Sequence, residues 1–229
     1  SYEGMTGNEV RCTYEMRDGR IVAGTSNGLA IIKDGKVVDK YTSRDGLKNP
    51  VILTVSEDDD GNIMAGTDGD GIYIFENDNI RRIGIEDGLG SDVIMRIKRD
   101  EKRGVIWVVT SNQVQYIKDG NIVTVNTFPY NNNFDVITED DEALWFVSSQ
   151  GIYVVDADAV LNDEISIYKL YDRANGLTSI PISHCLSGVD DEGNAYIAGQ
   201  TGVSAVNIRE MMEFSGLTIT DVTSIVDDA

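Results

Sequence analysis

A phrase that recurs along the chain constrains the fold more than any other feature. Residues 43–75 read SRDGLKNPVILTVSEDDDGNIMAGTDGDGIYIF, with two apolar runs set between three clusters rich in Asp, Gly and Asn. A Gly followed by Leu or Met stands at Gly4, Gly46, Gly88 and Gly176. The spacing predicts one further copy near residue 132, within PYNNNFD. A fixed period of this length is typical of repeat architectures, in which each unit buries its faces against its neighbours.

A second marker, a short strand after a polar turn, supports the same register. It reads IVAGT from Ile21, IMAGT from Ile63, IWVVT from Ile106, LWFVS from Leu144 and AYIAG from Ala195. Each copy divides into four short apolar runs joined by turn formers such as DDDGN and DGDG. Four antiparallel strands in about 40–45 residues is the size of one propeller blade. The sequence therefore predicts an all-β, β-propeller-type fold of about five four-stranded antiparallel blades.

The period also predicts how the domain is organised. The five copies are expected at about 3–45, 46–87, 88–131, 132–175 and 176–216, with 217–229 forming the last outer strand or opening a β-sandwich. The residues VLND at 160–163 lengthen the fourth copy and are expected to form a surface excursion. Because the inner strand of the first copy starts at Val10 behind a loop-like segment, we expect these blades to be part of a larger propeller. An open end of that kind promotes association, so an open arc that forms a homodimer through its ends is expected. The alternative is a strained five-blade ring, closed by LTITDVTSI as the outer strand of the fifth blade.

Charge narrows the classes of partner. The chain carries 19 Lys and Arg against 39 Asp and Glu, a net charge of −20. Nucleic acid binding needs clustered basic residues, and an acidic surface is repelled by anionic membranes, so neither partner is expected. Neutral and cationic ligands stay open. Cys12 and Cys185 have no metal-ligand spacing and are predicted to be small buried side chains.

The motif set is more specific than a generic propeller. The pattern D-G-L, a strand, D-x-x-G-N-I-x-x-G-T and then G-x-G-I-Y-x-F resembles the two-component regulator propeller repeat. Residues 45–75 carry it almost in full. Parts of it occur in 3–33, 87–118, 134–155 and 175–206.

This resemblance implies an extracytoplasmic sensor region, periplasmic or at the cell surface, of a membrane-anchored bacterial signalling protein. Proteins of this kind are hybrid histidine kinases or diguanylate cyclases. The implied role is to bind a small molecule or an oligosaccharide and to transmit a conformational signal. The alternative is a propeller scaffold that binds a protein partner and no small ligand.

An enzyme is the third class to weigh. A glycoside hydrolase needs two carboxylates facing each other across a cleft, whereas the carboxylates here sit in turns between strands. His184 is the only His, and no activating Asp or Ser motif surrounds it. We therefore predict no catalytic residues and no cofactor, and a propeller hydrolase or lyase remains the outside alternative.

Two further patterns invite functional readings. Asp58, Asp59 and Asp60 are contiguous, whereas a calcium loop needs alternating oxygen ligands, so a plain turn is favoured. Trp107 and Trp145 occupy equivalent strand positions in neighbouring copies. Packing between blades is predicted for them, with a sugar-stacking platform as the alternative.

Ligand binding concentrates on loops carried by a rigid scaffold, here the loops that link one blade's outer strand to the next blade's inner strand. The third of these, FPYNNNFD, replaces D-G-L with an aromatic and amide-rich segment, so it is the first candidate for recognition; a merely divergent turn is the alternative. The candidate ligand-binding residues are Tyr130, Asn131, Asn132 and Asn133, together with Asn49, Arg173 and His184 from neighbouring loops.

The acidic turns are not expected to hold a required metal, because the third copy replaces the acidic turn with EKRG. Treatment with a chelator should leave the melting temperature unchanged in a thermal unfolding experiment. A fall of many degrees after chelation would contradict this prediction.

Overall fold

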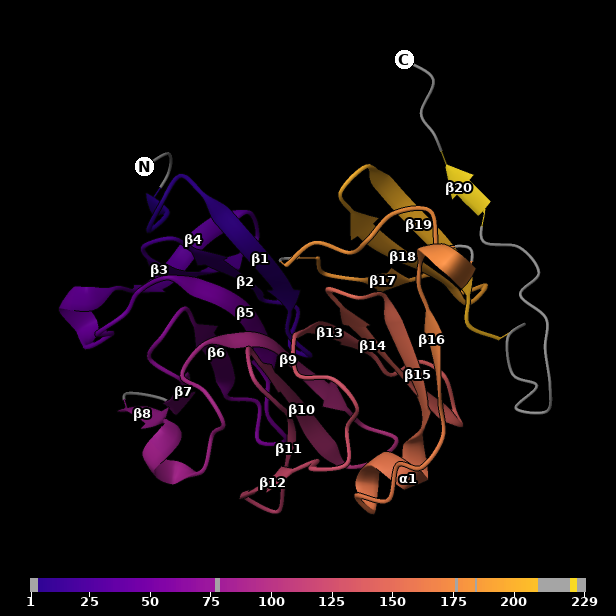
Figure 1. The fold of residues 1–229 in the computed structure, drawn as a ribbon. Helices are drawn as coiled ribbons and strands as arrows, with labels where there is room; N and C mark the ends of the chain where they lie inside the picture. Colours follow the sequence, from indigo (N-terminus) through magenta and orange to yellow (C-terminus); the bar gives the residue numbers. More distant parts are fainter. Residues whose placement is uncertain (1–3, 77–78, 176, 184, 210–222, 226–229) are drawn as a thin grey trace. The chain divides into compact units, whose positions relative to one another are not determined.

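The computed structural model describes residues 4–76, 79–175, 177–183, 185–209 and 223–225. Within these ranges the chain forms five four-stranded antiparallel sheets, each with its strands in chain order (Figure 1). The prediction of an all-β, propeller-type fold with five sequential blades is confirmed. The chain divides into two compact units, Ser1–Thr124 with the first three sheets and Val125–Ala229 with the last two.

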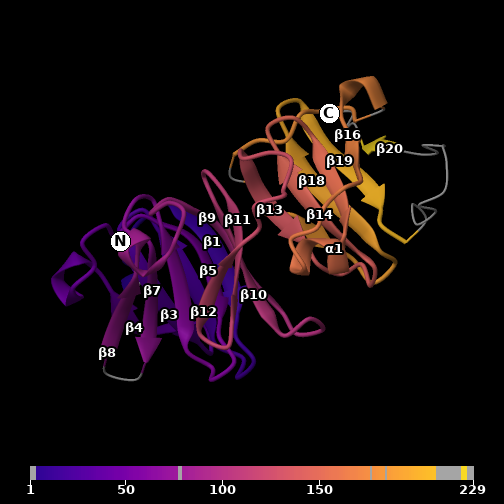
Figure 2. The same cartoon turned by 60° about the horizontal axis from the view of Figure 1, so that its bottom comes forward.

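The first unit contains three blades of similar length. The first blade is β1 (Val10–Glu15), β2 (Ile21–Thr25), β3 (Gly28–Lys33) and β4 (Lys36–Tyr41). The second is β5 (Ile52–Glu57), β6 (Ile63–Thr67), β7 (Ile72–Glu76) and β8 (Asn79–Ile83). The third is β9 (Ile94–Asp100), β10 (Val105–Thr110), β11 (Val114–Lys118) and β12 (Asn121–Thr124). The inner strands β1, β5 and β9 lie side by side (Figure 2).

The second unit contains the fourth and fifth blades. The fourth is β13 (Asn133–Ile137), β14 (Ala143–Ser148), β15 (Ile152–Asp156) and β16 (Tyr168–Tyr171). The fifth is β17 (Gly188–Val189), β18 (Asn194–Gly199), β19 (Gly202–Asn207) and β20 (Thr223–Ile225), in which β20 pairs antiparallel with β19. The excursion expected at 160–163 contains the end of a five-residue helix, α1 (Ala157–Leu161), inserted between β15 and β16.

A buried hydroxyl closes the hairpin between the second and third strands of four blades. Thr67 Oγ1 donates to the carbonyl of Gly71 at 2.9 Å, and Ser148 Oγ donates to that of Gly151 at 2.9 Å. Thr25 and Thr110 make the same bond, to the carbonyls of Gly28 and Gln113. A buried hydroxyl needs a partner, and this one finds it within its own turn. The Thr of the repeated G-T step therefore has a structural role.

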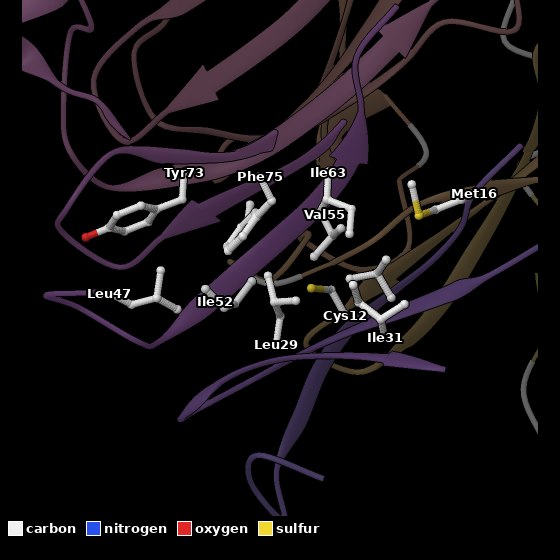
Figure 3. Packing of buried hydrophobic residues seen from close by; sticks show 12 residues of the cluster. Cys12, Met16, Leu29, Ile31, Leu47, Ile52, Val55, Ile63, Tyr73 and Phe75 are labelled. Carbon is white, nitrogen blue, oxygen red and sulfur yellow. The ribbon is translucent and has the colours of Figure 1, made fainter. Parts of the chain in front are cut away.

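The blades of the first unit stack through apolar faces. Leu29 and Ile31 of the first blade pack with Ile52, Val55 and Phe75 of the second in one buried cluster (Figure 3). A second cluster joins the second and third blades. All six residues of β5 are buried, so both faces of this strand are covered.

Glycines on the second strands let the next blade approach closely. A Cβ on Gly66 would lie 2.7 Å from Cγ2 of Ile94 and 2.6 Å from Cγ2 of Thr54. At the equivalent Gly24, a Cβ would lie 2.7 Å from Cγ2 of Ile52. Real Cβ atoms do not approach so closely, so a side chain at either site would push the neighbouring inner strand away.

We expect Gly66→Ala to lower the free energy of unfolding by about 1–3 kcal/mol, because the added methyl overpacks the interface between the second and third blades. Urea denaturation measures this change. Gly188→Ala is the control, since nothing lies within 4 Å of its Cβ position, and it should change stability by less than about 0.5 kcal/mol. Equal stabilities of the two variants would contradict the close-approach argument.

Candidate functional site

The D-G-L loops are short turns held by their own side chains. In the second blade's loop, Asp45 Oδ2 accepts from the backbone N of Thr42 at 2.9 Å and caps the 3-10 turn Ser43–Asp45. Gly46 follows with a φ of 111°, in the left-handed region that favours glycine, and Leu47 is buried. The loop before the third blade repeats this design with Asp87, whose carboxylate accepts from Gly84 N at 2.9 Å.

A third-strand side chain anchors each of these loops from below. The backbone N of Lys48 donates to the hydroxyl of Tyr73 at 2.9 Å, and Gly90 N donates to Oε1 of Gln115 at 2.8 Å. Burial and the hydrogen bond to Asp70 raise the pKa of Tyr73 to about 12, so the hydroxyl stays protonated and also donates to Asp70. The consensus loop is therefore fastened to its blade through a backbone N–H.

The loop before the fourth blade lacks that fastening. The strand pairing aligns the fourth blade with the second. Asn133 pairs with Ser148 as Ile52 pairs with Thr67, so Asn133 is the equivalent of Ile52. The position of Gly46 is thus taken by Thr127, and not by a residue near 132 as the regular spacing predicted. The position near 132 assumed equal spacing between Gly88 and Gly176. The insertion around α1 lengthens the fourth copy after its third strand, so this copy begins earlier than equal spacing predicts. Pro129 takes the place of Lys48 and has no N–H to donate.

Aromatic contacts replace the missing hydrogen bond. Phe128 takes the place of Leu47 and packs edge-on against Phe146, with ring centroids 4.6 Å apart. The ring of Tyr130 stacks on Tyr153, the counterpart of Tyr73, with centroids 5.7 Å apart and an interplanar angle of 15°. The hydroxyl of Tyr153 donates instead to Oε1 of Gln150 at 2.7 Å. The departure from D-G-L therefore builds an aromatic cluster on the fourth blade.

Two of the rings are open to solvent at the sides of a buried one. Tyr153 is buried, Tyr130 is half-buried, and Tyr168 of β16 is 46% exposed with its centroid 5.4 Å from that of Tyr153. Burial, together with the neighbouring Tyr168, Tyr130 and Asp172, raises the pKa of Tyr153. The hydroxyl of Tyr153 therefore stays protonated near pH 7. We call Tyr130, Tyr153 and Tyr168 the tyrosine row.

The three predicted asparagines have different environments. Asn131 is exposed, and Asn132 is exposed with its Nδ2 donating to Ser149 Oγ at 3.0 Å. Ser149 Oγ also bonds the hydroxyl of Tyr130 at 2.8 Å. Asn133 is buried, donates to the carbonyl of Tyr130, and leaves its Oδ1 without a hydrogen-bond partner. Asn131 and Asn132 are therefore open to a ligand, whereas Asn133 supports the loop from inside.

The other candidates lie elsewhere. Asn49 occupies the position equivalent to Tyr130 in the second blade, where its Oδ1 accepts from Val51 N at 3.1 Å and its amide donates to the carbonyl of Asp68. Arg173 is exposed in the 3-10 turn Arg173–Asn175 that follows the fourth blade. His184 lies outside the described residues.

An acidic residue of the excursion secures the divergent loop. Asp163 Oδ1 accepts from the backbone N of Thr127 at 2.7 Å and from its Oγ1 at 2.9 Å, and Oδ2 accepts from Asn126 Nδ2 at 2.8 Å. Burial alone would raise the pKa of Asp163, but these hydrogen bonds outweigh it and lower the pKa below the ordinary 3.8. The excursion thus replaces the capping Asp of the consensus turn.

The acidic turns bond to themselves. Asp58 accepts from the backbone N of Asp60 at 3.0 Å and of Asn62 at 2.8 Å, and Asp190 repeats the pattern in the fifth blade. The bonds from Asn194 lower the pKa of Asp190 to about 2. In the part of the chain that the structure describes, no three His, Cys, Asp or Glu side chains are grouped to hold a metal.

The tryptophans are buried, as packing predicted. Trp107 is 0% and Trp145 1% exposed, so neither ring presents a face to a sugar. Their indole N–H groups donate to Asp100 at 3.0 Å and to Asp140 at 2.9 Å. Cys12 and Cys185 are likewise buried, as expected.

Sequence reasoning did not select Ser149, Tyr153 and Tyr168. Tyr153 is the Tyr of the repeated G-I-Y step, so the sequence pattern does identify it. That pattern was used only to recognise the repeat and not to predict a binding residue. Nothing local distinguishes Ser149 or Tyr168, because their part in the site depends on contacts with residues on other strands.

The fold defines a class, the β-propellers built from repeated four-stranded antiparallel blades. The extracellular domain of a putative hybrid two-component system from B. thetaiotaomicron superposes with a TM-score of 0.73 and 20% identity, over 95% of this chain and 32% of that one. A second hybrid two-component extracellular domain from that organism gives a TM-score of 0.57 and 18% identity, over 88% and 36%. The chain thus spans about a third of the length of these neighbours.

A propeller enzyme shares the architecture. Catalytically inactive virginiamycin B lyase from Staphylococcus aureus, in a structure with quinupristin, gives a TM-score of 0.65 and 16% identity, over 88% of this chain and 68% of that one. No family model and no curated protein matches the chain. At these identities the likeness establishes the fold. The predicted resemblance to two-component regulator propellers is therefore confirmed for the fold. Among the described residues, no helix is long and apolar enough to cross a membrane.

We expect Asp163→Asn to lower the free energy of unfolding at pH 7 by about 1 kcal/mol, because the amide loses one acceptor and the charge that hold the loop. The folded-state pKa of Asp163 is lowered, so its contribution is present above about pH 4 and is lost as the pH falls through the folded-state pKa. The difference between variant and wild type should therefore shrink toward pH 3 in thermal unfolding.

Asp34→Asn is the matched control for this experiment. Asp163 and Asp34 both have a left-handed backbone, with φ values of 55° and 51°, which Asn tolerates. Asp34 lies in an exposed turn of the first blade. The control should match the wild type at every pH. A loss in Asp163→Asn that is the same at pH 3 and pH 7 would contradict the electrostatic assignment.

Proposed function

We propose that this chain is a ligand-sensing propeller module of a bacterial signal-transduction protein of the hybrid histidine kinase or diguanylate cyclase type. In this proposal it lies outside the cytoplasm, its parent protein is membrane-anchored, and the chain itself catalyses no reaction. The similarity to extracellular domains of two-component proteins supports the class.

The tyrosine row is the observation that carries a ligand-binding role. Exposed aromatic faces beside neutral amide and hydroxyl groups suit a neutral polyhydroxylated ligand, because a flat ring packs against C–H groups while the amides bond hydroxyls. Asn131, Asn132 and Ser149 supply donors and acceptors beside Tyr130. The proposed ligand is therefore a small molecule or an oligosaccharide, bound at the tyrosine row.

The rigidity of the loop supports the same proposal. Tyr130 is held by a stacked ring and a hydrogen bond, and the preceding Thr127 is held by Asp163. A loop that is ordered before binding loses little conformational entropy when the ligand arrives. The aromatic loop is thus suited to recognition, whereas the Asp side chains of the D-G-L loops bond to the backbone of their own turns.

A thermal-shift screen of neutral oligosaccharides tests the proposal, since a ligand that binds only the folded protein raises the melting temperature. For a ligand so found, Tyr168→Ala should weaken binding by about tenfold, corresponding to the loss of one aromatic stacking contact. Tyr196→Ala, which removes a 37% exposed Tyr from the fifth blade, should leave the affinity unchanged.

Two results would contradict the assignment. Equal loss of affinity in both variants would place the ligand elsewhere on the chain. If no neutral oligosaccharide or metabolite stabilised the protein, but a protein partner did, the chain would be the interaction scaffold that the sequence left as the alternative.

A further inference from the structure

A cavity of about 260 Å³ opens between the second and third blades, in the first compact unit. Its floor is apolar and comes from both blades, with Met64 and Ile74 from the second and Ile106 and Ile117 from the third. These side chains belong to, or pack against, the buried cluster that joins the two blades. The cavity is therefore a gap in an apolar interface, and it shares no residue with the tyrosine row.

The rim of the cavity is acidic. It includes Asp58, Asp59 and Asp60 from the turn between β5 and β6, and Asp119 from the turn between β11 and β12. Among the described residues of the lining, Arg81 is the one basic side chain, and its Nε is paired with Glu76 at 3.1 Å.

Two of the four carboxylates are already engaged. Asp58 bonds its own turn, and Asp59 accepts from Nε of Arg99 at 2.9 Å. The carboxylates of Asp60 and Asp119 make no hydrogen bond or ion pair with any described residue, and the two lie on turns of different blades. A ligand in the cavity would therefore meet unneutralised negative charge at the rim and methyl groups at the floor.

Both turns hold their carboxylates on rigid backbone. Asp119 and Gly120 have φ values of 50° and 75°, the left-handed pair of a tight two-residue hairpin. The turn with Asp60 is fixed by three hydrogen bonds to the carboxylate of Asp58. The charges are thus placed before a ligand arrives, which lowers the entropic cost of binding.

We propose that this cavity binds an aliphatic ammonium ion, with the alkyl chain on the apolar floor and the ammonium group between Asp60 and Asp119. A bare metal ion would gain nothing from the methyl groups, since Ca²⁺ and Mg²⁺ need six or more oxygen ligands. A neutral alkane would leave the carboxylates unused. An engineered apolar cavity of about 150 Å³ holds benzene, so 260 Å³ suits a chain of about six to eight carbon atoms.

Hexylammonium chloride is the probe, compared with 1-hexanol and sodium hexanoate by isothermal titration calorimetry at pH 7 and low ionic strength. We expect saturable binding of hexylammonium, weaker binding of hexanol and none of hexanoate. Added salt should weaken the binding of hexylammonium, because the rim is open to solvent.

The double substitution Asp60→Asn with Asp119→Asn should weaken hexylammonium binding by about tenfold, since it removes both unpaired charges. Asn tolerates the left-handed backbone at position 119, so the fold should persist. The control is Asp34→Asn with Glu192→Gln, which removes one carboxylate charge from each of the equivalent turns in the first and fifth blades. It should bind as the wild type does.

The position of the ligand has its own test. Ile117→Phe narrows the cavity at a half-buried site and should abolish hexylammonium binding while the circular dichroism spectrum stays unchanged. The proposal is overturned if hexylammonium does not bind saturably, if hexanol binds as tightly, or if the control pair loses as much affinity as the rim pair.

Discussion

The second blade has two apolar faces, and each is covered by a neighbouring blade. The strands β5 and β6 are buried along their whole length, so alternate side chains pack in opposite directions. Burying one side chain such as Ile94 contributes about 1.5–3 kcal/mol, which is available only if the next inner strand comes into contact. Gly24 and Gly66 permit that approach, because a side chain there would collide with Ile52 or Ile94. The small residues and apolar runs of the repeat are therefore explained by the need of neighbouring blades to stack closely.

The loops between blades inherit their geometry from this stacking. In the second and third blades the D-G-L turn caps itself through its Asp, buries its Leu and is fastened by a backbone N–H. The polar groups of such a loop bond to the loop itself and to its own blade. The fourth blade keeps the buried apolar anchor, as Phe128, but its fastening is made by Tyr130 and Asp163. This exchange leaves aromatic faces and amides open without loosening the loop.

The excess of negative charge is distributed between structural and unpaired groups. Asp58, Asp163 and Asp190 accept hydrogen bonds that order turns, and Asp100 and Asp140 receive the indole N–H groups of buried Trp residues. Carboxylates of this kind are part of the fold. Asp60 and Asp119 are not engaged in this way, and together with an apolar floor they distinguish one cavity by its chemistry.

The sequence by itself determined the all-β fold, the five blades and their strands, because a strict repeat of apolar runs and turn residues allows few other ways to bury its surface. It also singled out the loop at Tyr130, since a departure from a repeat is visible without coordinates. Only the tertiary structure decided which residues of that loop face solvent, placing Asn133 inside and Asn131 outside. Only the tertiary structure showed that Tyr130 contacts Ser149 and Tyr153, and that Tyr153 in turn contacts Tyr168. It also showed that Thr127 is bonded to Asp163. These partners come from different strands and from the inserted segment, so their proximity depends on strand register and on the path of the insertion, which no local pattern encodes.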